Sequence, residues 1–248
     1  MSFFNCAVII PVYKSDLNPD EIKSFTSCLS NLSDKYIVIV THRNVILNEF
    51  FNIADEYSVP LHVEYFNENY FRSISGYSLL CMSKLFYKRF SKFQYMLILQ
   101  LDVFIFSNKL DYWCNKSYDY IGAPLVKKVN NIYEISGNYY NGGLSLRNTD
   151  FFIKSYNNKW YKHCVNVSVS RPNGNKILKV VHGLILAFIS KYNIPFVSFN
   201  VGMEDMYMGS VSGLKKPIVE EAMLFSYEDY PEYLFSLTNK FPFGVHKW

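Results

Sequence analysis

The sequence predicts an α/β protein with a mostly parallel central sheet flanked by helices. Three short apolar runs in the first 66 residues, 6–13, 35–42 and 61–66, have the length and the β-branched content of buried strands. The segments between them, 16–32 and 47–57, carry apolar residues at helical spacing. Strands that alternate with helices form parallel sheets, because each helical crossover returns the chain in the same direction.

The apolar run from 94 to 106 is predicted to be the central strand, entered from a helix over 69–90. Gln100 and Asp102 are set into this run. A carboxylate is rare in a buried strand, and open α/β sheets bind ligands at the carboxyl ends of their strands. Asp102 is therefore predicted to meet a ligand or a metal ion. The alternative is that Asp102 only caps the following turn.

The second half of the chain is less regular. A hairpin over 127–149 is expected to turn at Asn141, Gly142 and Gly143, because Asn and Gly suit tight turns. The stretch 157–179 is polar, weakly periodic and predicts no clear element. The other expected elements are a short helix and turn over 110–124, a helix over 180–192, a strand over 194–199, a loop over 201–210 and a helix followed by a turn over 217–228.

Composition excludes several classes of protein. The net charge is +4, and the basic residues are scattered among acidic ones, which argues against a nucleic-acid surface. An anionic small ligand or a weak preference for a membrane surface stays open. The five cysteines form no CxxC pair, so they are expected to be reduced core thiols. The N-terminus lacks a basic leader and no apolar run reaches ~20 residues, so a cytoplasmic protein is expected.

A first group of candidate residues has the chemistry of a cation site. Asp102 is a hard oxygen ligand of the kind that Mg²⁺ or Mn²⁺ takes, and Gln100, two residues earlier on the same face of the strand, offers a second oxygen. His246, near the end of the chain, is the natural third contact. A single histidine more often only satisfies a local hydrogen bond. Lys247 is placed beside it to contact a phosphate.

Two further motifs have both a plain and a functional interpretation. The Asn141-Gly142-Gly143 segment is either an ordinary turn or a backbone that must come close to a ligand. The adjacent acids Glu204 and Asp205 are either a solvated loop or a pair in which one carboxylate faces a cleft as a general base.

Residues near the first strand and before the long helix are candidates for binding a nucleotide. Pro11, Val12 and Tyr13 follow the first strand, where Tyr13 could stack on a base. Arg72 and Ser73 precede the helix and could contact phosphate or ribose.

Seven blocks of this chain, taken together and in order, resemble glycosyltransferases of the GT-A fold, and most closely a group of bacterial-type sugar transferases. The resemblance runs from Cys6 to Trp248 and implies a Rossmann-like N-terminal half with a smaller mixed acceptor-side region. It implies a single domain over 1–248, with a nucleotide-binding half of about 1–108 and an acceptor-binding half of about 109–248. The blocks are 10–14, 69–77, 100–106, 118–124, 141–147, the pair at 204–205 and 242–248.

The resemblance implies how the cation site would work. In the wider fold the central strand usually ends in Asp-x-Asp, whose second acid binds a divalent cation that bridges the diphosphate. Here Gln100 replaces the first acid, so Asp102 alone remains. The resemblance assigns Asp102 and, as in relatives with a C-terminal histidine, His246 to Mn²⁺ or Mg²⁺. Gln100 would then bind ribose or belong to a weaker coordination shell of the metal. Lys247 or Arg147 would help to neutralise the negative charge of the diphosphate.

The adjacent acids resemble those of inverting members, whose second acid is the base. This assigns Asp205 as the catalytic base and Glu204 as an acceptor-binding residue. The expected donor is a nucleotide sugar, a UDP-sugar above all, and the expected acceptor is a glycan or a lipid-linked saccharide, with contact at the inner face of a membrane left open. The alternatives are a retaining transferase on the same fold and a catalytically inactive sugar- or nucleotide-binding protein. A nucleotidyltransferase would show a Gly-rich, basic first turn, which residues 10–20 lack.

Overall fold

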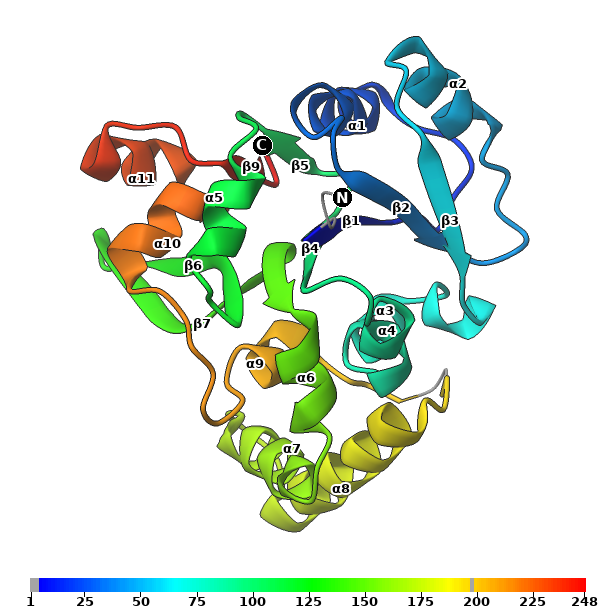
Figure 1. The fold of residues 1–248 in the computed structure, drawn as a ribbon. Coiled ribbons are helices and arrows are strands. Elements are labelled where there is room, and N and C mark those ends of the chain that lie inside the picture. Colours follow the sequence, from blue (N-terminus) through cyan, green and yellow to red (C-terminus); the bar gives the residue numbers. More distant parts are fainter. Residues whose placement is uncertain (1–4, 197–198) are drawn as a thin grey trace.

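The computed structural model describes residues 5–196 and 199–248, and its centre is a six-stranded sheet (Figure 1). The strand order is β3-β2-β1-β4-β7-β6, in which the first four strands are parallel and the last two antiparallel. This confirms the predicted α/β class with a mostly parallel sheet. The strands are β1 (Cys6–Pro11), β2 (Tyr36–Thr41), β3 (Leu61–Tyr65), β4 (Tyr95–Leu99), β6 (Tyr120–Val129) and β7 (Ile132–Asn148).

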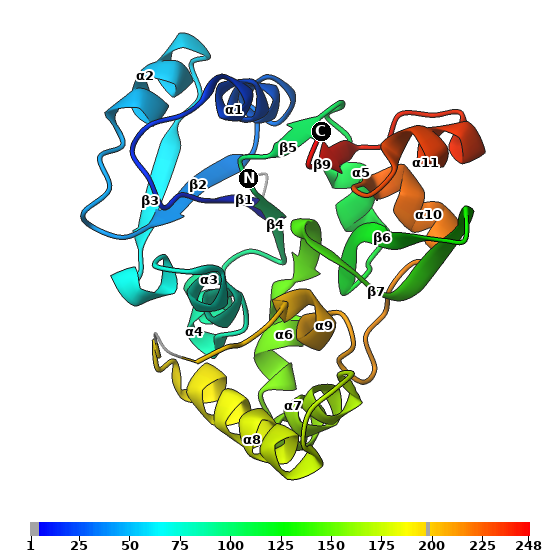
Figure 2. The ribbon, with the colours of Figure 1, turned by 180° about the vertical axis from the view of Figure 1, so that it is seen from behind.

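Helices cover both faces of this sheet (Figures 1 and 2). Successive side chains of a strand point to opposite faces, so in β1 Ala7 and Ile9 join one core cluster while Val8 and Ile10 join another. The second cluster contains residues of α1 (Pro19–Asn31), α2 (Asn48–Glu56), α5 (Leu110–Asn115) and α10 (Val219–Phe225). The first contains residues of α3 (Ile74–Cys81), α4 (Lys84–Arg89), α6 (Thr149–Ser155), α7 (Lys159–Ser170), α8 (Lys176–Tyr192) and α9 (Glu204–Met208).

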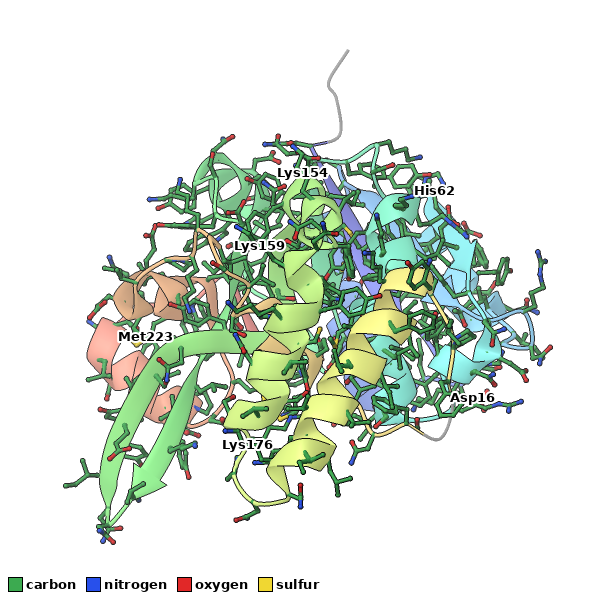
Figure 3. The ribbon with its side chains drawn as sticks, turned by 90° about the horizontal axis from the view of Figure 1, so that it is seen from below. Asp16, His62, Lys154, Lys159, Lys176 and Met223 are labelled. Atoms are coloured by element: carbon green, nitrogen blue, oxygen red, sulfur yellow. The ribbon has the colours of Figure 1, made fainter. Side chains whose placement is uncertain are left out.

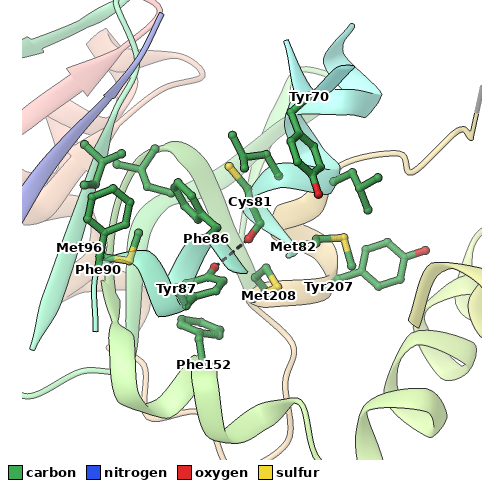
Figure 4. Packing of buried hydrophobic residues seen from close by; sticks show 14 of the residues in the cluster. Tyr70, Cys81, Met82, Phe86, Tyr87, Phe90, Met96, Phe152, Tyr207 and Met208 are labelled. Carbon is green, nitrogen blue, oxygen red and sulfur yellow. Dashed lines mark hydrogen bonds between the residues drawn. The ribbon is translucent and has the colours of Figure 1, made fainter. Parts of the chain in front are cut away.

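Aromatic side chains fill the first cluster (Figure 4). The Tyr87 ring stacks on Phe152 with 5.0 Å between centroids, and its hydroxyl donates to the Cys81 carbonyl at 2.9 Å. Each buried ring of this size contributes about 1.5–3 kcal/mol from its apolar area. All five cysteines are buried and free, as expected from their spacing.

The run 94–106 is not one strand, contrary to the prediction. A turn at residues 101–102, in which the Val103 amide donates to the Gln100 carbonyl at 3.1 Å, separates β4 from β5 (Val103–Ile105). β5 belongs to a second sheet of order β5-β9-β8, with β8 (Ser226–Tyr227) and β9 (Gly244–His246). The break therefore brings the C-terminal strand β9 directly beside Asp102.

The predicted helix over 69–90 is also broken, because serine hydroxyls cap two shorter helices. After a 3₁₀ turn (Glu68–Tyr70), Ser73 accepts from the Gly76 amide at the start of α3, and Ser83 accepts from the Phe86 amide at the start of α4. Ile74 is 85% exposed, so it does not lie on the buried face.

The second half is more helical than the sequence predicts. α7 lies within the stretch that predicted no element, α8 begins earlier than expected with Asn175 as its cap, and α9 lies within the expected loop. α11 (Pro231–Thr238) is a further helix. Residues 194–196 and 199 are not in the strand expected there, and 197–198 lie outside the described residues. No helix of the described chain has the length and apolar character needed to cross a membrane.

Candidate active site

A cavity of about 650 Å³ opens where β1 and β4 end and the middle of β7 passes. The carboxyl ends of parallel strands are where open α/β sheets bind ligands. Thirteen of the residues predicted from the sequence line this cavity: Pro11, Tyr13, Arg72, Ser73, Gln100, Asp102, Asn141, Gly142, Gly143, Glu204, Asp205, His246 and Lys247. Val12 does not, because it is completely buried and its amide donates to the Val40 carbonyl at 2.9 Å.

His246 is the point where several polar groups meet. Its Nε2 lies 3.1 Å from Asp102 Oδ1 and 3.1 Å from Gln100 Oε1. The pairing of β5 with β9 fixes this contact, because Val103 lies opposite His246 in the antiparallel register. The Lys247 amide also donates to the Asp102 carbonyl at 2.9 Å. The turn after β4 and the end of the chain therefore form one unit.

Glu228 is a second carboxylate on the same imidazole, and no pattern in the sequence singles it out. Its Oε1 lies 3.1 Å from His246 Nδ1 and 2.6 Å from Lys247 Nζ. Burial alone would lower the pKa of His246, but Asp102 and Glu228 outweigh it and raise the pKa to about 9. Burial opposes ionisation of Asp102 and Glu228, yet contact with His246 holds the pKa of each below its usual value. The cluster is thus an imidazolium and an ammonium held by two carboxylates.

Asn141, Gly142 and Gly143 are not a hairpin turn, contrary to the prediction. The turn of the β6–β7 hairpin lies at Asn130 and Asn131, both with positive φ, and the three residues lie within β7. A Cβ on Gly142 would overlap the Glu204 carboxylate, and one on Gly143 would overlap the His246 ring. The two glycines therefore allow side chains of the site to pack directly on the β7 backbone.

Glu204 is paired with a fully buried arginine. Arg147, on β7, donates through a terminal guanidinium nitrogen to Glu204 Oε1 at 3.0 Å. The same guanidinium donates to the Tyr87 hydroxyl at 3.1 Å and to the Ser145 hydroxyl at 3.0 Å. Burial disfavours the charged guanidinium, but the surrounding groups raise the pKa of Arg147 above its usual value. Arg147 thus holds Glu204 at the cavity wall and does not itself line the cavity.

Asp205 lies beside this pair without a similar partner. It is only 3% exposed, lines the cavity at the start of α9, and its buried Oδ1 has no hydrogen-bond partner in the described chain. Burial, and then the neighbouring charge of Glu204, raise the pKa of Asp205 to about 7. A carboxylate with a pKa near neutral pH is suited to accept a proton from a substrate.

The residues predicted to bind a nucleotide base, ribose or phosphate also line the cavity, with the exception of Val12. Tyr13 is 63% exposed and available for stacking. Arg72 is ion-paired with Glu68, and the Ser73 hydroxyl is the cap acceptor of α3. Glu21 and Tyr77 also line the cavity, and the sequence carried no signal that singled them out.

The atoms around His246 Nε2 have the chemistry of a site for Mn²⁺ or Mg²⁺. Asp102 Oδ1, Gln100 Oε1 and Nε2 converge, and the Glu228 carboxylate lies 3.1 Å from the other ring nitrogen, on the side where a carboxylate commonly stands behind a ligating histidine. Within residues 5–196 and 199–248, no group of three or more His, Cys, Asp or Glu side chains is placed to hold a metal ion. The protein would thus supply two ligands and an amide oxygen, so further ligands must come from a substrate or water.

Solved glycosyltransferases share this architecture, and the fold is the GT-A fold. An active-site mutant of LgtC superposes with a TM-score of 0.54 at 13% identity, covering 97% of this chain and 86% of that chain. Core-mannan synthase A (CmsA/Ktr4) of Aspergillus fumigatus, in a Mn/GDP form, gives a TM-score of 0.52 at 11% identity, covering 85% of this chain and 70% of that chain. Galactosyltransferase LgtC in complex with donor and acceptor sugar analogues gives a TM-score of 0.52 at 9% identity, covering 97% of this chain and 86% of that chain.

The model of the family described as "Protein of unknown function (DUF5672)" matches residues 60–246, and this chain belongs to that family. The matched region extends from just before β3 to the last residue of β9, so it includes most of the cavity wall. No curated protein matches the chain.

Proposed function

We propose that this protein is a glycosyltransferase that moves a sugar from a nucleoside diphosphate sugar to an acceptor hydroxyl, with inversion at the anomeric carbon. The observation that carries the proposal is the buried Asp205 carboxylate, with its pKa raised to about 7, in the same cavity as the cationic His246–Lys247 pair. The pair suits a leaving diphosphate and the carboxylate suits a base, and the fold is one that glycosyltransferases use.

The donor is proposed to lie along the carboxyl ends of the strands. Its base, uracil in the favoured case, would stack near Tyr13, and Arg72 and Ser73 would contact ribose or phosphate. Arg72 would have to exchange its ion pair with Glu68 for the substrate, which costs little at an exposed pair. The diphosphate would then face Lys247 and the turn at Asp102.

The proposed reaction is a single displacement. The acceptor oxygen attacks the anomeric carbon and forms the new glycosidic bond, while the bond from that carbon to the diphosphate oxygen breaks. The electron pair of the broken bond leaves on the diphosphate, and the acceptor proton passes to Asp205. Glu204, fixed by Arg147, accepts a hydrogen bond from the acceptor sugar and orients it.

A divalent cation is proposed to be held by Asp102 and His246, with Gln100 beside them. When bound, Mn²⁺ or Mg²⁺ would neutralise negative charge on the diphosphate. The protein's own contribution at this place is the charge of Lys247 and the negative charge of Glu228 beside His246 Nδ1. A metal here must displace the proton from Nε2, so metal affinity is expected to rise with pH.

The test is a panel of UDP-, GDP- and CMP-sugars, incubated with and without Mn²⁺. Hydrolysis or transfer with one nucleotide class, together with a thermal shift caused by the corresponding nucleoside diphosphate, would support the proposal. An Asp55→Asn variant, altered at an exposed carboxylate on α2, is the control for nonspecific effects. Absence of both turnover and nucleotide binding across the panel would refute it.

A retaining course on the same fold is the rival, in which the two acids only position the acceptor. Proton NMR of the first product separates the two, because inversion gives the opposite anomer of the donor and retention gives the same one. The acceptor is proposed to be a glycan or a lipid-linked saccharide. A catalytically inactive binding protein is not favoured, because such a protein has no need of a buried carboxylate with its pKa raised to about 7.

A further inference from the structure

α8 exposes an unusual stripe of large apolar side chains. At 100° per residue they fall within an arc of about 120° on one side of the helix. Ile177 is 72% exposed, and the others are at least 41% exposed. The stripe consists of Ile177, Leu178, Val181, Leu184, Ile185, Phe188 and Tyr192.

The rest of the α8 circumference is already used for packing. Leu186, Ala187 and Ile189 are buried in the core cluster, and Gly183 lets the helix approach α7 so closely that a Cβ would overlap the backbone of Val165. Figure 3 looks onto α7 and α8 side by side, and Figure 1 places them at the end of the molecule away from α1 and α2. The stripe is therefore an outer surface of a packed hairpin.

The same part of the chain carries an excess of positive charge that accounts for the net positive charge of the protein. Residues 151–203 contain seven Lys and Arg and no Asp or Glu, whereas the whole chain has a net charge of only +4. The remainder is thus net acidic. Among the described residues, Lys154 is the only one of the seven with an ion pair to a carboxylate, that of Asp150. The seven are Lys154, Lys159, Lys162, Arg171, Lys176, Lys179 and Lys191.

We propose that the α7–α8 hairpin docks on an anionic lipid surface, with the α8 stripe buried at the boundary between headgroups and acyl chains. A helix with one apolar face and a basic surround lies in the plane of such an interface. A second copy of this chain is disfavoured as the occupant, because pairing the hairpin with itself would bring two segments of like charge together.

The hairpin is connected to the candidate active site. An Arg171 guanidinium nitrogen donates to the Val201 carbonyl at 2.6 Å, three residues before Glu204. Docking would thus hold the acceptor side of the cavity near the membrane, where a lipid-linked saccharide is found. This last step rests on the proposed function, whereas docking itself does not.

Vesicle co-sedimentation tests the docking. The protein is expected to pellet with vesicles of equal parts phosphatidylcholine and phosphatidylglycerol and to stay in solution with phosphatidylcholine alone. The Leu184→Glu/Phe188→Glu variant, changed at two exposed stripe positions, should bind at least tenfold more weakly. The matched control, Ile46→Glu/Leu237→Glu, adds the same charge at exposed apolar positions elsewhere and should bind nearly as the wild type does.

A second variant tests the charge independently. Lys162→Gln/Lys176→Gln should lower the partition coefficient about fivefold for each lysine. Circular dichroism shows whether each variant is folded, and turnover of the nucleotide sugar is measured separately without vesicles, so failure of docking and failure of the proposed function are distinguishable. The proposal is overturned if the wild type does not pellet with anionic vesicles, or if the stripe variant binds them equally well. It is also overturned if the wild type sediments as a dimer that the stripe variant makes monomeric.

Discussion

Replacing Asp205 by asparagine should have opposite effects on turnover and on stability. The substitution keeps the size of the side chain and removes a carboxylate that is 3% exposed and lacks a partner for Oδ1 in the described chain. Loss of a general base typically costs about 10²–10⁴-fold in rate. Binding of the nucleoside diphosphate should change little, because Asp205 is proposed to meet the acceptor. The stability of the variant should exceed that of the wild type above neutral pH.

The size of the stability effect follows from the pKa. Burial and Glu204 raise the pKa of Asp205 from 3.8 to about 7, and each unit corresponds to about 1.36 kcal/mol, so the ionised form costs about 4 kcal/mol. The pKa is higher in the folded state, so the folded protein binds more protons between pH 4 and 7 and loses stability as the pH rises through that window. About 3 kcal/mol of the loss falls between pH 5 and 8, or roughly 6–12 °C in Tm for a chain of this size.

The assay is thermal unfolding of both proteins at pH 5 and pH 8, with transfer measured at pH 8. The difference in Tm between Asp205→Asn and wild type should grow with pH, because all other titrating groups are common to both. Asp55→Asn should show no such trend. A difference that stays constant from pH 5 to 8 would refute the burial argument, and normal turnover by the variant would refute the assignment of the base.

Three other substitutions test the rest of the site. Gly143→Ala should cost about 1–3 kcal/mol of stability by overpacking against the His246 ring and should weaken binding of the nucleotide and metal, as measured by unfolding and calorimetry. Glu228→Gln should lower the pKa of His246 from about 9, because it removes one of the two carboxylates beside the imidazole. The variant should then lose less stability than the wild type as the pH rises from 6.5 through 9, and NMR titration of the imidazole measures the shift. Arg147→Met should cost about 3–5 kcal/mol in urea unfolding, because it leaves the Glu204 carboxylate buried without its partner; a cost below about 1 kcal/mol would contradict this account.

The first half of the fold was accessible from the sequence because its periodicity is strong and local. Predicted strands at 6–13, 35–42 and 61–66 correspond to β1, β2 and β3 within one or two residues at most ends. The break of the run 94–106 into two strands could not be predicted, because hydropathy indicates which residues are buried and not where the chain changes direction. Both β4 and β5 are buried, and only the turn between them reveals two sheets.

Two helices, α7 and α9, could not be predicted because neither shows a clear helical periodicity of apolar residues. α7 is half apolar, but only Trp160, Cys164 and Ser168 of it are buried, and its other apolar residues do not keep to one face, so its periodicity is weak. α9 is five residues long, too short for a periodic pattern to appear. Such elements are specified by tertiary packing, and local propensity is a weak guide to them.

The site residues could be predicted from the sequence because most of them follow predicted strands, and the carboxyl ends of parallel strands lie at the same edge of a sheet. Strand ends and the C-terminal tail meet there, and the cavity lining contains thirteen of the fourteen predicted residues. Val12 is the exception because alternation along β1 turns its side chain into the core. Glu228 was missed because its partner, His246, comes from a strand 18 residues away that carried no strand signal.

The contacts of His246 explain why a neutral glutamine suits position 100. An acid at this position would place a third carboxylate around one imidazole that already meets Asp102 and Glu228, and like charges in a buried site are costly. An amide oxygen supplies the same acceptor without the charge. The imidazole therefore has one carboxylate at each ring nitrogen, Asp102 at Nε2 and Glu228 at Nδ1, and the amide oxygen of Gln100 adds an acceptor at Nε2 without a third negative charge.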